Sequence, residues 1–243
     1  MKTKKKPRPR NAKTQGLKTK TALAVWALDE LKKFHAGRLS HLAREKKDSD
    51  NQKETQQQAA FRILIGTILS HRTKDAKTEQ ATTALLKHYK TPQQLAKAPH
   101  AKVRALIKPV GFYNSKAKYV VKCSQELVER FGGNVPNTFE LLTMLTGVGR
   151  KTAGCVLAYA FELPAIPVDS HVHQIANRLG IVRTSDPLET EAELMNVMPR
   201  NRWIDVNELL VLHGQTICVP VSPMCSRCSL QTKCPKIGVK ARR

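Results

Sequence analysis

The residues with the clearest chemical potential lie in the stretch 141–169, LLTMLTGVGRKTAGCVLAYAFELPAIPVD. It reads as a short helix, a turn at Gly147-Val148-Gly149, a second helix and an extended run that ends at Asp169. Two glycines around one apolar residue allow a tight turn and a close approach to a ligand. A helix that opens directly behind such a turn presents its N-terminal N–H groups to an anion. The pattern therefore predicts a phosphate-binding turn.

Two residues beside this turn could carry out covalent chemistry. Lys151 stands in the first turn of the second helix. Its amine must be neutral to attack carbon, and an unperturbed pKa near 10.4 leaves only ~0.04% neutral at pH 7. Partial burial and the positive helix end would favour the neutral form, whereas a nearby Asp169 would oppose it. Asp169 could act as a base or stabilise a cationic sugar. The plainer alternatives are a phosphate contact for Lys151 and a helix N-cap for Asp169.

Four of the six cysteines lie close together near the C-terminus, in the pattern Cys-x6-Cys-x2-Cys-x5-Cys: Cys218, Cys225, Cys228 and Cys234. Four thiolates in so short a run can surround one metal centre. Zinc sites usually join two Cys-x2-Cys pairs across a longer insert. The irregular gaps therefore favour an iron–sulfur cluster, with zinc as the alternative. Cys123 and Cys155 fall on helical patterns, and we expect them in the core.

The charge of the chain points to a polyanionic partner. Its 243 residues carry a formal net charge of +23, and the pI is about 10.1. Such a charge favours nucleic acid, with nonspecific polyanion binding as the alternative. The 41% of hydrophobic residues excludes a wholly disordered chain. We find no apolar run of membrane-spanning length and no secretory signal. The cysteines suggest a reducing compartment, so we expect an intracellular, DNA-associated protein of a prokaryotic cytoplasm or nucleoid rather than of a nucleus.

The periodicity predicts an all-α fold. Apolar residues in the run 61–69 recur at i, i+3, i+4, i+7 and i+8, which is typical of a buried helix face. Few stretches alternate as strands do, and we expect about ten helices joined by short loops. Residues 22–35 should form one of these helices. The basic segment 1–20 is expected to be disordered, and the polar run 44–58 is expected to be a linker or an exposed helix start.

Four further residues have possible functions beside plainer alternatives. Arg72 and Phe112 lie on turns between helices, where a polar and an apolar side chain could press against a duplex and unstack its bases. The alternative is that both are ordinary loop residues. His171 and His213 lie near the expected sites, and we expect both to be hydrogen-bonded structural histidines rather than catalysts.

Taken together, these segments resemble endonuclease III of the helix-hairpin-helix DNA glycosylase superfamily. The resemblance rests on LTGVGRKTAGCVLAYAF…VDSH, on GFYNSKA at 111–117, on LHG at 212–214 and on the four-cysteine pattern, and it covers about residues 30–236. It implies a base-excision-repair enzyme with glycosylase and AP lyase activities, in which Lys151 is the Schiff-base nucleophile and Asp169 the assisting carboxylate. Its substrates would be oxidised pyrimidines and abasic sites in double-stranded DNA.

The resemblance also implies a cofactor and a domain organisation. The four cysteines would hold a [4Fe-4S] cluster with a mainly structural role, and the protein would act as a monomer without a membrane. Two helical lobes would flank a DNA-binding cleft. We assign residues 21–52 and 164–243 to the cluster lobe, and residues 53–163 to a helical barrel lobe with the helix-hairpin-helix at about 138–161.

The chain departs from the family pattern at four places. Arg72 aligns with the glutamine that fills the gap left by the flipped base, and Phe112 aligns with the leucine wedge. Thr146 replaces the hairpin proline, which we expect to be a minor change. The loop 219–224 lacks the basic residues often seen there. The first two departures leave the lesion preference open, and the last could weaken one DNA contact.

Two other functions compete with this interpretation. One is a monofunctional mismatch glycosylase, for thymine/uracil or adenine, on the same fold. Those branches generally lack the lysine, so Lys151 argues against it. The other is a non-catalytic DNA-binding protein that uses the hairpin and the cluster for affinity alone.

Overall fold

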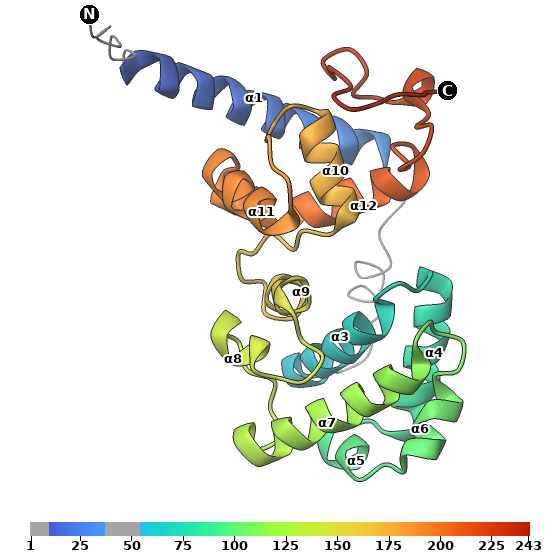
Figure 1. Ribbon diagram of the computed structural model, residues 1–243. Helices are drawn as coiled ribbons and strands as arrows, with labels where there is room; N and C mark the ends of the chain where they lie inside the picture. The colour runs from blue at the N-terminus through green and yellow to red at the C-terminus, as the bar shows by residue number, and fades with distance from the viewer. Residues whose placement is uncertain (1–9, 37–53) are drawn as a thin grey trace, which may run out of the picture. The chain divides into compact units, whose positions relative to one another are not determined.

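The computed structural model describes residues 10–36 and 54–243. Every regular element in these residues is a helix, which confirms the predicted all-α class (Figure 1). The chain divides into two compact units. One unit combines the N-terminal segment through Arg38 with Val168–Arg243, and the other spans Leu39–Pro167.

The described residues of the first unit form four packed α-helices and two short 3-10 helices. Helix α10 packs on α12, and α1 contacts both α11 and α12. Its elements are α1 (Arg10–Phe34), α10 (Ser170–Arg178), α11 (Pro187–Val197), η1 (Arg200–Arg202), α12 (Trp203–Thr216) and η2 (Cys225–Arg227). Leu28 and Leu31 of α1 and Val206 and Leu210 of α12 are buried in this unit. A C-terminal segment without regular helices follows η2 and carries the last cysteine (Figure 1).

Helix α1 begins earlier than the sequence suggests. It starts at Arg10, inside the segment 1–20 for which we expected disorder, and runs without a break to Phe34. Residues 10–20 contain no proline and are rich in good helix formers, so the helix can propagate backwards from its buried part at Ala24, Leu28 and Leu31. Residues 1–9 lie outside the described part of the chain.

In the described residues of the second unit, from 54 onwards, there are seven helices, and the first of them, α3, is the buried central one. They are α3 (Gln56–Ser70), α4 (Asp75–His88), α5 (Pro92–Ala96), α6 (His100–Leu106), α7 (Tyr113–Phe131), α8 (Phe139–Thr143) and α9 (Arg150–Ala160). Helix α3 packs against α9 and α4, and α7 packs against α5 (Figure 1). Leu64, Ile65 and Leu69 of α3 are completely buried, which confirms the predicted core face.

Local signals set several helix starts. Thr55 forms a capping box with Gln58 at the start of α3, inside the polar run 44–58, of which residues 44–53 lie outside the described residues. Thr91 caps α5 and Asp186 caps α11, and in both helices a proline occupies the first turn. A side-chain oxygen at the N-cap satisfies an N–H group that the helix itself leaves unpaired.

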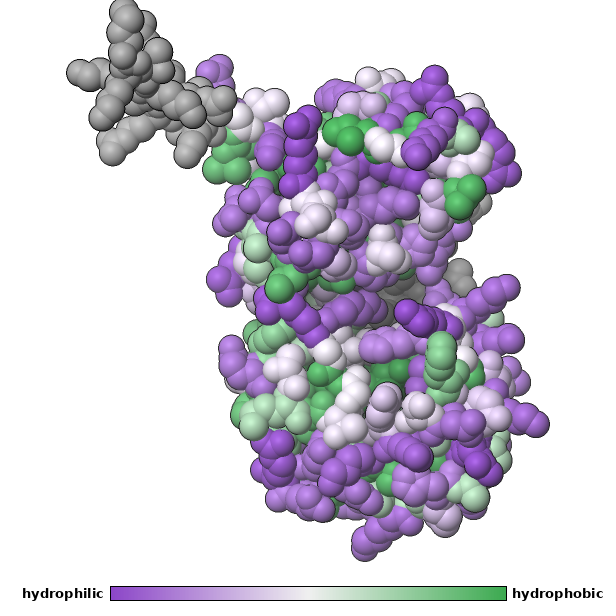
Figure 2. Space-filling view, in the orientation of Figure 1, coloured by the Kyte–Doolittle hydropathy of each residue, from purple (hydrophilic) through white to green (hydrophobic). Residues whose placement is uncertain are grey.

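The visible surface is mainly hydrophilic. Figure 2 shows polar and charged side chains over most of the face of each unit, with apolar residues in small separate areas. Among the helices that the structure describes, none combines the length and the apolar character that a membrane span requires. The apolar surface of both units is thus directed mainly into their cores.

Candidate active site and cysteine pocket

The glycine turn before α9 is held in a shape that only glycine allows at its first position. Gly147 has a φ of +80°, and a Cβ there would lie 3.1 Å from the Cβ of Tyr119. Val148 is buried and anchors the turn in the unit. Gly149 has ordinary extended backbone and is the N-cap of α9, and an added Cβ would meet nothing within 4 Å. The turn therefore exposes backbone at the start of α9, as a phosphate-binding turn requires.

The turn is anchored by a carboxylate that the sequence did not reveal. Glu126 of α7 accepts two hydrogen bonds from Thr146, one from its backbone N–H at 2.7 Å and one from its hydroxyl at 2.7 Å. A proline at this position could make neither bond, because it has no N–H group and no hydroxyl. The replacement of the hairpin proline, which we expected to be minor, thus gives the turn a two-bond attachment to α7.

Lys151 lies half-buried in the first turn of α9, between two residues that fix this turn. On one side, the Arg150 guanidinium stacks over the ring of Phe139 at 4.6 Å and ties α9 to α8. On the other side, the fully buried Thr152 shares a hydrogen bond of 3.1 Å between its hydroxyl and Nε2 of His71. Partial burial, then the charges of Lys151 and Lys116, lower the pKa of His71. A histidine that stays neutral therefore lies within electrostatic reach of Lys151.

Asp169 belongs to the other unit, where it is the N-cap of α10. Its Oδ1 accepts hydrogen bonds from the backbone N–H groups of His171 and Val172, both at 2.9 Å. The N-cap role named as the plainer alternative is therefore present. Because both bonds use Oδ1, the cap does not engage Oδ2. The cap and a second role for the carboxylate are compatible.

The two candidate histidines sit in packed surroundings. His171 lies so close to α12 that a Cβ on Gly214 would be 2.5 Å from its Nδ1, which explains why LHG carries a glycine at 214. His213 is 1% exposed and its ring contacts His35 at 3.2 Å. Burial, followed by the charge of His35, lowers the pKa of His213 to about 4. His213 is therefore a neutral, hydrogen-bonded core residue near pH 7.

The structure brings Arg72 and Phe112 together, although the sequence only placed each on a turn. Their φ values are +51° and +57°, in the left-handed region that non-glycine residues rarely adopt. The guanidinium of Arg72 lies 5.9 Å from the ring centroid of Phe112, and the Phe112 side chain is 63% exposed. Two such backbone conformations cost on the order of 1 to 3 kcal/mol each and need support from their surroundings. We call this exposed pair the Arg72–Phe112 tip.

Lys116 supports the tip and was missed in the sequence. It is 4% exposed, and its ammonium donates hydrogen bonds to the carbonyls of Leu69 and His71 and to the Thr73 hydroxyl, at 2.7, 2.6 and 2.9 Å. Burial lowers its pKa to about 8. A signal was present, since Lys116 shares its helix face with buried Val120 and interrupts an apolar stripe.

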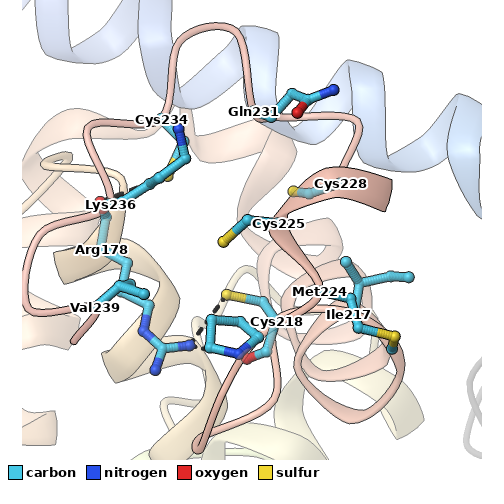
Figure 3. A pocket seen from close by; sticks show the side chains of 11 residues that line it. Arg178, Ile217, Cys218, Met224, Cys225, Cys228, Gln231, Cys234, Lys236 and Val239 are labelled. Carbon is cyan, nitrogen blue, oxygen red and sulfur yellow. Dashed lines mark hydrogen bonds between the residues drawn. The ribbon is translucent and has the colours of Figure 1, made fainter. Parts of the chain in front are cut away.

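The four C-terminal cysteines line a single pocket in the first unit (Figure 3). All four are free thiols with partly exposed side chains, whereas Cys123 and Cys155 are buried in the core as expected. The other lining residues are both apolar, including Ile217, Met224 and Val239, and polar or charged, namely Arg178, Gln231 and Lys236. The four thiols of the run 218–234 thus meet around one space with mixed walls.

Burial disfavours the thiolate form of three pocket cysteines, and a nearby arginine partly offsets this at one of them. Burial is the main cause that raises the pKa of Cys218, Cys234 and Cys228, the last to about 11. Arg178 opposes this at Cys218, where Nη1 donates to Sγ at 3.3 Å (Figure 3). A metal that displaces these protons would gain thiolate ligands already supplied with a cation. In the described parts of the chain, no three His, Cys, Asp or Glu side chains are placed to bind a metal ion.

Comparison with known proteins places this architecture in a family. Residues 65–200 match the family described as HhH-GPD superfamily base excision DNA repair protein. Endonuclease III of Thermotoga maritima is 46% identical over 198 residues, which cover 81% of this chain and 92% of that protein. The chloroplastic endonuclease III homolog 2 of Arabidopsis thaliana is 42% identical over 184 residues, which cover 72% of this chain and 48% of that protein.

The fold agrees with the sequence comparison. A solved structure of a trapped covalent intermediate between an endonuclease III and DNA matches with a TM-score of 0.77 and 30% sequence identity. The match covers 89% of this chain and 96% of the solved one. The chain therefore belongs to the endonuclease III family within the HhH-GPD superfamily of base excision DNA repair proteins.

Proposed function

We propose that Lys151 is the nucleophile with which this chain, a base excision repair DNA glycosylase with AP lyase activity, acts on damaged DNA. The main support for this assignment is the position of Lys151 in the first turn of α9, directly behind the glycine turn. The positive end of the helix disfavours a second positive charge, so it favours the neutral amine that can attack. The related endonuclease III trapped on DNA forms a covalent intermediate, which supports a nucleophilic mechanism here.

The reaction proceeds through covalent steps on Lys151. The damaged base leaves the stack, and the neutral Nζ of Lys151 attacks C1′ of its sugar. The C1′–N bond breaks, and the base leaves with that electron pair and a proton from Nζ. The Nζ lone pair then forms a double bond to C1′ as the C1′–O4′ bond breaks and O4′ takes a proton from solvent, which gives a protonated imine. Loss of a proton from C2′ expels the 3′-phosphate by β-elimination and breaks the strand, and water hydrolyses the imine and frees the lysine. We propose oxidised pyrimidines and abasic sites as the substrates.

Asp169 is the proposed assisting carboxylate. Its Oδ1 caps α10, which leaves Oδ2 for a second interaction. A carboxylate can accept the proton that the reaction releases or stabilise positive charge on the sugar. These two roles require proximity to the sugar rather than a lowered lysine pKa, and both are compatible with the N-cap.

Double-stranded DNA is the proposed partner, bound by a single copy of the chain. The Gly147-Val148-Gly149 turn offers backbone N–H groups to a phosphate, and the exposed Arg72–Phe112 tip offers an apolar wedge and a cation to the bases. The formal net charge of +23 favours this partner. A repair enzyme of this kind would act inside a cell, where its DNA and a reducing environment coincide.

The cysteine pocket is the proposed site of a [4Fe-4S] cluster. Each of its four irons would take one thiolate, from Cys218, Cys225, Cys228 and Cys234. All four thiols line the same pocket, which supports this proposal. A bound cluster would cross-link the C-terminal segment and would take no part in the reaction. We accordingly propose that residues 21–52 and 164–243 form the cluster lobe and that residues 53–163 form the barrel lobe with the hairpin.

Borohydride trapping tests the proposed nucleophile. Reduction of the imine should join the wild-type protein permanently to DNA that contains an abasic site. The Lys151→Ala variant should form no adduct, and strand cleavage should fall by at least about a thousandfold, because the nucleophile itself is lost. Lys108→Ala, which removes an exposed lysine of the same unit, serves as the matched control. Adduct formation that survives in Lys151→Ala would exclude this assignment.

The trapping experiment also separates the competing functions. A monofunctional glycosylase would release a base without cutting the strand, and a non-catalytic binding protein would bind abasic DNA without turnover. Family membership and Lys151 both favour the bifunctional reaction over these alternatives.

A further inference from the structure

The Arg72–Phe112 tip consists of two loops that are each poorly stable by themselves. Arg72 and Phe112 both have left-handed backbone, and both side chains are exposed, so neither is fixed by burial of its own. The cation–π contact between them, at 5.9 Å, is too weak at an exposed site to hold two loops in place. Another part of the structure must therefore hold the tip in shape.

The ammonium of Lys116 provides this support for the first loop. A charged lysine has three N–H donors, and all three are used: on the Leu69 carbonyl, the His71 carbonyl and the Thr73 hydroxyl. The first two acceptors are at the C-terminal end of α3, where a positive charge also meets the negative end of the helix. Two of these acceptors precede Arg72 in the sequence and one follows it, so the three bonds hold the chain on both sides of Arg72.

The second loop is attached to the first through Thr73 and Gly111. The Thr73 hydroxyl, which accepts a bond from Lys116, also accepts one from the Gly111 N–H at 3.1 Å. A Cβ on Gly111 would lie 2.9 Å from the carbonyl oxygen of Arg72, so only glycine permits this close approach. Phe112 follows Gly111 directly, and its backbone carbonyl accepts the N–H of Lys116 at 3.0 Å. The same lysine residue thus contacts both halves of the tip.

The supported tip is also joined to the helix that carries Lys151. His71 lies between the tip and α9, and its Nε2 shares a hydrogen bond with the hydroxyl of Thr152, the residue after Lys151. Thr152 is fully buried, which makes this bond a fixed attachment rather than a surface contact. A continuous set of contacts therefore runs from the tip through Lys116 and His71 to the first turn of α9.

We propose that Lys116 is a positioning residue that preforms the Arg72–Phe112 tip as one rigid wedge for duplex DNA, at a fixed position relative to Lys151. This inference rests on the proposed function, in which the tip enters the duplex and Lys151 attacks the sugar. Lys116 is buried, and its ammonium uses its three donors on groups of the protein itself. It acts by removing the conformational freedom that two strained loops would otherwise lose on binding.

The proposal separates duplex from single-stranded substrates. A wedge is needed only where a base must be separated from a partner strand. An abasic site in a single-stranded oligonucleotide needs Lys151 but no wedge. Loss of the Lys116 support should therefore reduce activity on the duplex and leave activity on the single strand nearly unchanged. A general loss of structure would reduce both.

The experiment compares borohydride adduct formation by the full chain on duplex and single-stranded abasic oligonucleotides. Lys116→Met keeps the length of the side chain and removes all three donors. The rate at which this variant forms the adduct on the duplex should fall by about ten- to a hundredfold, as expected when reacting groups are misplaced. Its rate of adduct formation on the single strand should stay within about twofold of wild type, because the substitution leaves the nucleophile Lys151 in place. Lys122→Met removes an exposed lysine from the same helix and should leave both rates unchanged.

A second variant keeps the test decisive if Lys116→Met does not fold. Thr73→Val removes the hydroxyl that joins Lys116 to Gly111 without a change of size. It should lower the duplex-to-single-strand ratio in the same direction, by about three- to tenfold for the loss of a hydrogen bond. An unchanged ratio in Thr73→Val, or equal losses on both substrates in a folded Lys116→Met, would overturn the proposal. Failure of the wild-type protein to form any adduct would instead overturn the proposed function.

Discussion

The cysteine pocket and the Arg72–Phe112 tip are assembled in opposite ways. The four cysteines come from one short run of chain, Cys218 to Cys234, and their pattern alone suggested a metal centre. The tip and its support come from the end of α3, the start of α7 and the first turn of α9. The first site is local and is the proposed site of a cofactor, whereas the second is long-range and is held by the protein's own hydrogen bonds.

This difference predicts two kinds of response to substitution. The proposed cluster would be one unit held by all four thiolates, so the removal of one thiolate should affect the whole site. The tip depends on several separate hydrogen bonds, each with a modest net contribution. Substitutions there should have graded effects that appear mainly in function. The following experiments test this contrast.

Removal of one pocket cysteine should have the largest effect. If the proposed cluster is bound, the wild-type protein should have a broad absorbance near ~400 nm, and Cys225→Ala should lose it. Hydrogen exchange should show lost protection in the segment 218–239, with α3 still protected. Cys123→Ala is the control, because it removes a buried core thiol outside the pocket and should keep the colour. A colourless wild-type protein that contains zinc and is active would contradict the cluster.

Removal of the Glu126 carboxylate should have a clear but smaller effect. Glu126→Ala leaves both the N–H and the hydroxyl of Thr146 without their acceptor. The free energy of unfolding should fall by about 2 to 3 kcal/mol, and duplex affinity should weaken because the glycine turn is released. Denaturant unfolding and a duplex titration measure the two effects. Glu129→Ala, an exposed carboxylate of the same helix, should change neither, and equal behaviour of the two variants would contradict this role.

For the wild-type protein, the ratio of the adduct-formation rate on duplex DNA to that on single-stranded DNA should fall as pH rises through about 8. Burial lowers the pKa of Lys116 to about 8, and the neutral amine keeps only two donors for three acceptors. His71, its titratable neighbour, is already neutral because its own pKa is lowered by partial burial and by Lys151 and Lys116. Because Lys151 acts on both substrates, the effect of pH on Lys151 itself enters both rates and cancels in their ratio. A several-fold fall is expected, since loss of one hydrogen bond is worth about 1 kcal/mol.

The sign of the stability effect excludes unfolding as the cause of that fall. The unfolded chain keeps the Lys116 proton up to the ordinary pKa of 10.5, whereas the folded chain releases it near 8. The unfolded state therefore binds more protons between these values, and this lysine makes the fold more stable as pH rises. A ratio that stays constant from pH 7 to 9 would show that the third bond to Lys116 does not support the tip.

A helix cap that belongs to neither site should give the smallest effect. Asp186→Ala removes the side chain that accepts bonds from the N–H groups of Leu188 and Glu189 at the start of α11. The free energy of unfolding should fall by about 1 kcal/mol. Absorbance, adduct formation and the substrate ratio should all match wild type. Any change in the ratio would show that the ratio reports general stability, which would weaken the contrast between the two sites.

The sequence predicted the helical class and several local features because their signals are local. The apolar stripe of residues 61–69, the Thr91 cap and the glycine turn at 147–149 each depend on neighbours along the chain. The prediction was less successful at 10–20, where charge suggested disorder and α1 is helical. A high charge indicates that side chains are exposed to solvent but does not decide whether the backbone is helical. The helix is propagated from a buried segment that begins beyond residue 20.

The sequence by itself determined the family, the nucleophile candidate Lys151 and the cysteine set, since each depends on residue type and spacing along one stretch of chain. Only the tertiary structure showed that Arg72 and Phe112 meet, that Glu126 anchors Thr146, and that Lys116 is buried. The physical reason is that these contacts join helices distant in sequence. A buried ammonium is stable only where several acceptors converge on it, and that convergence exists only in the folded chain.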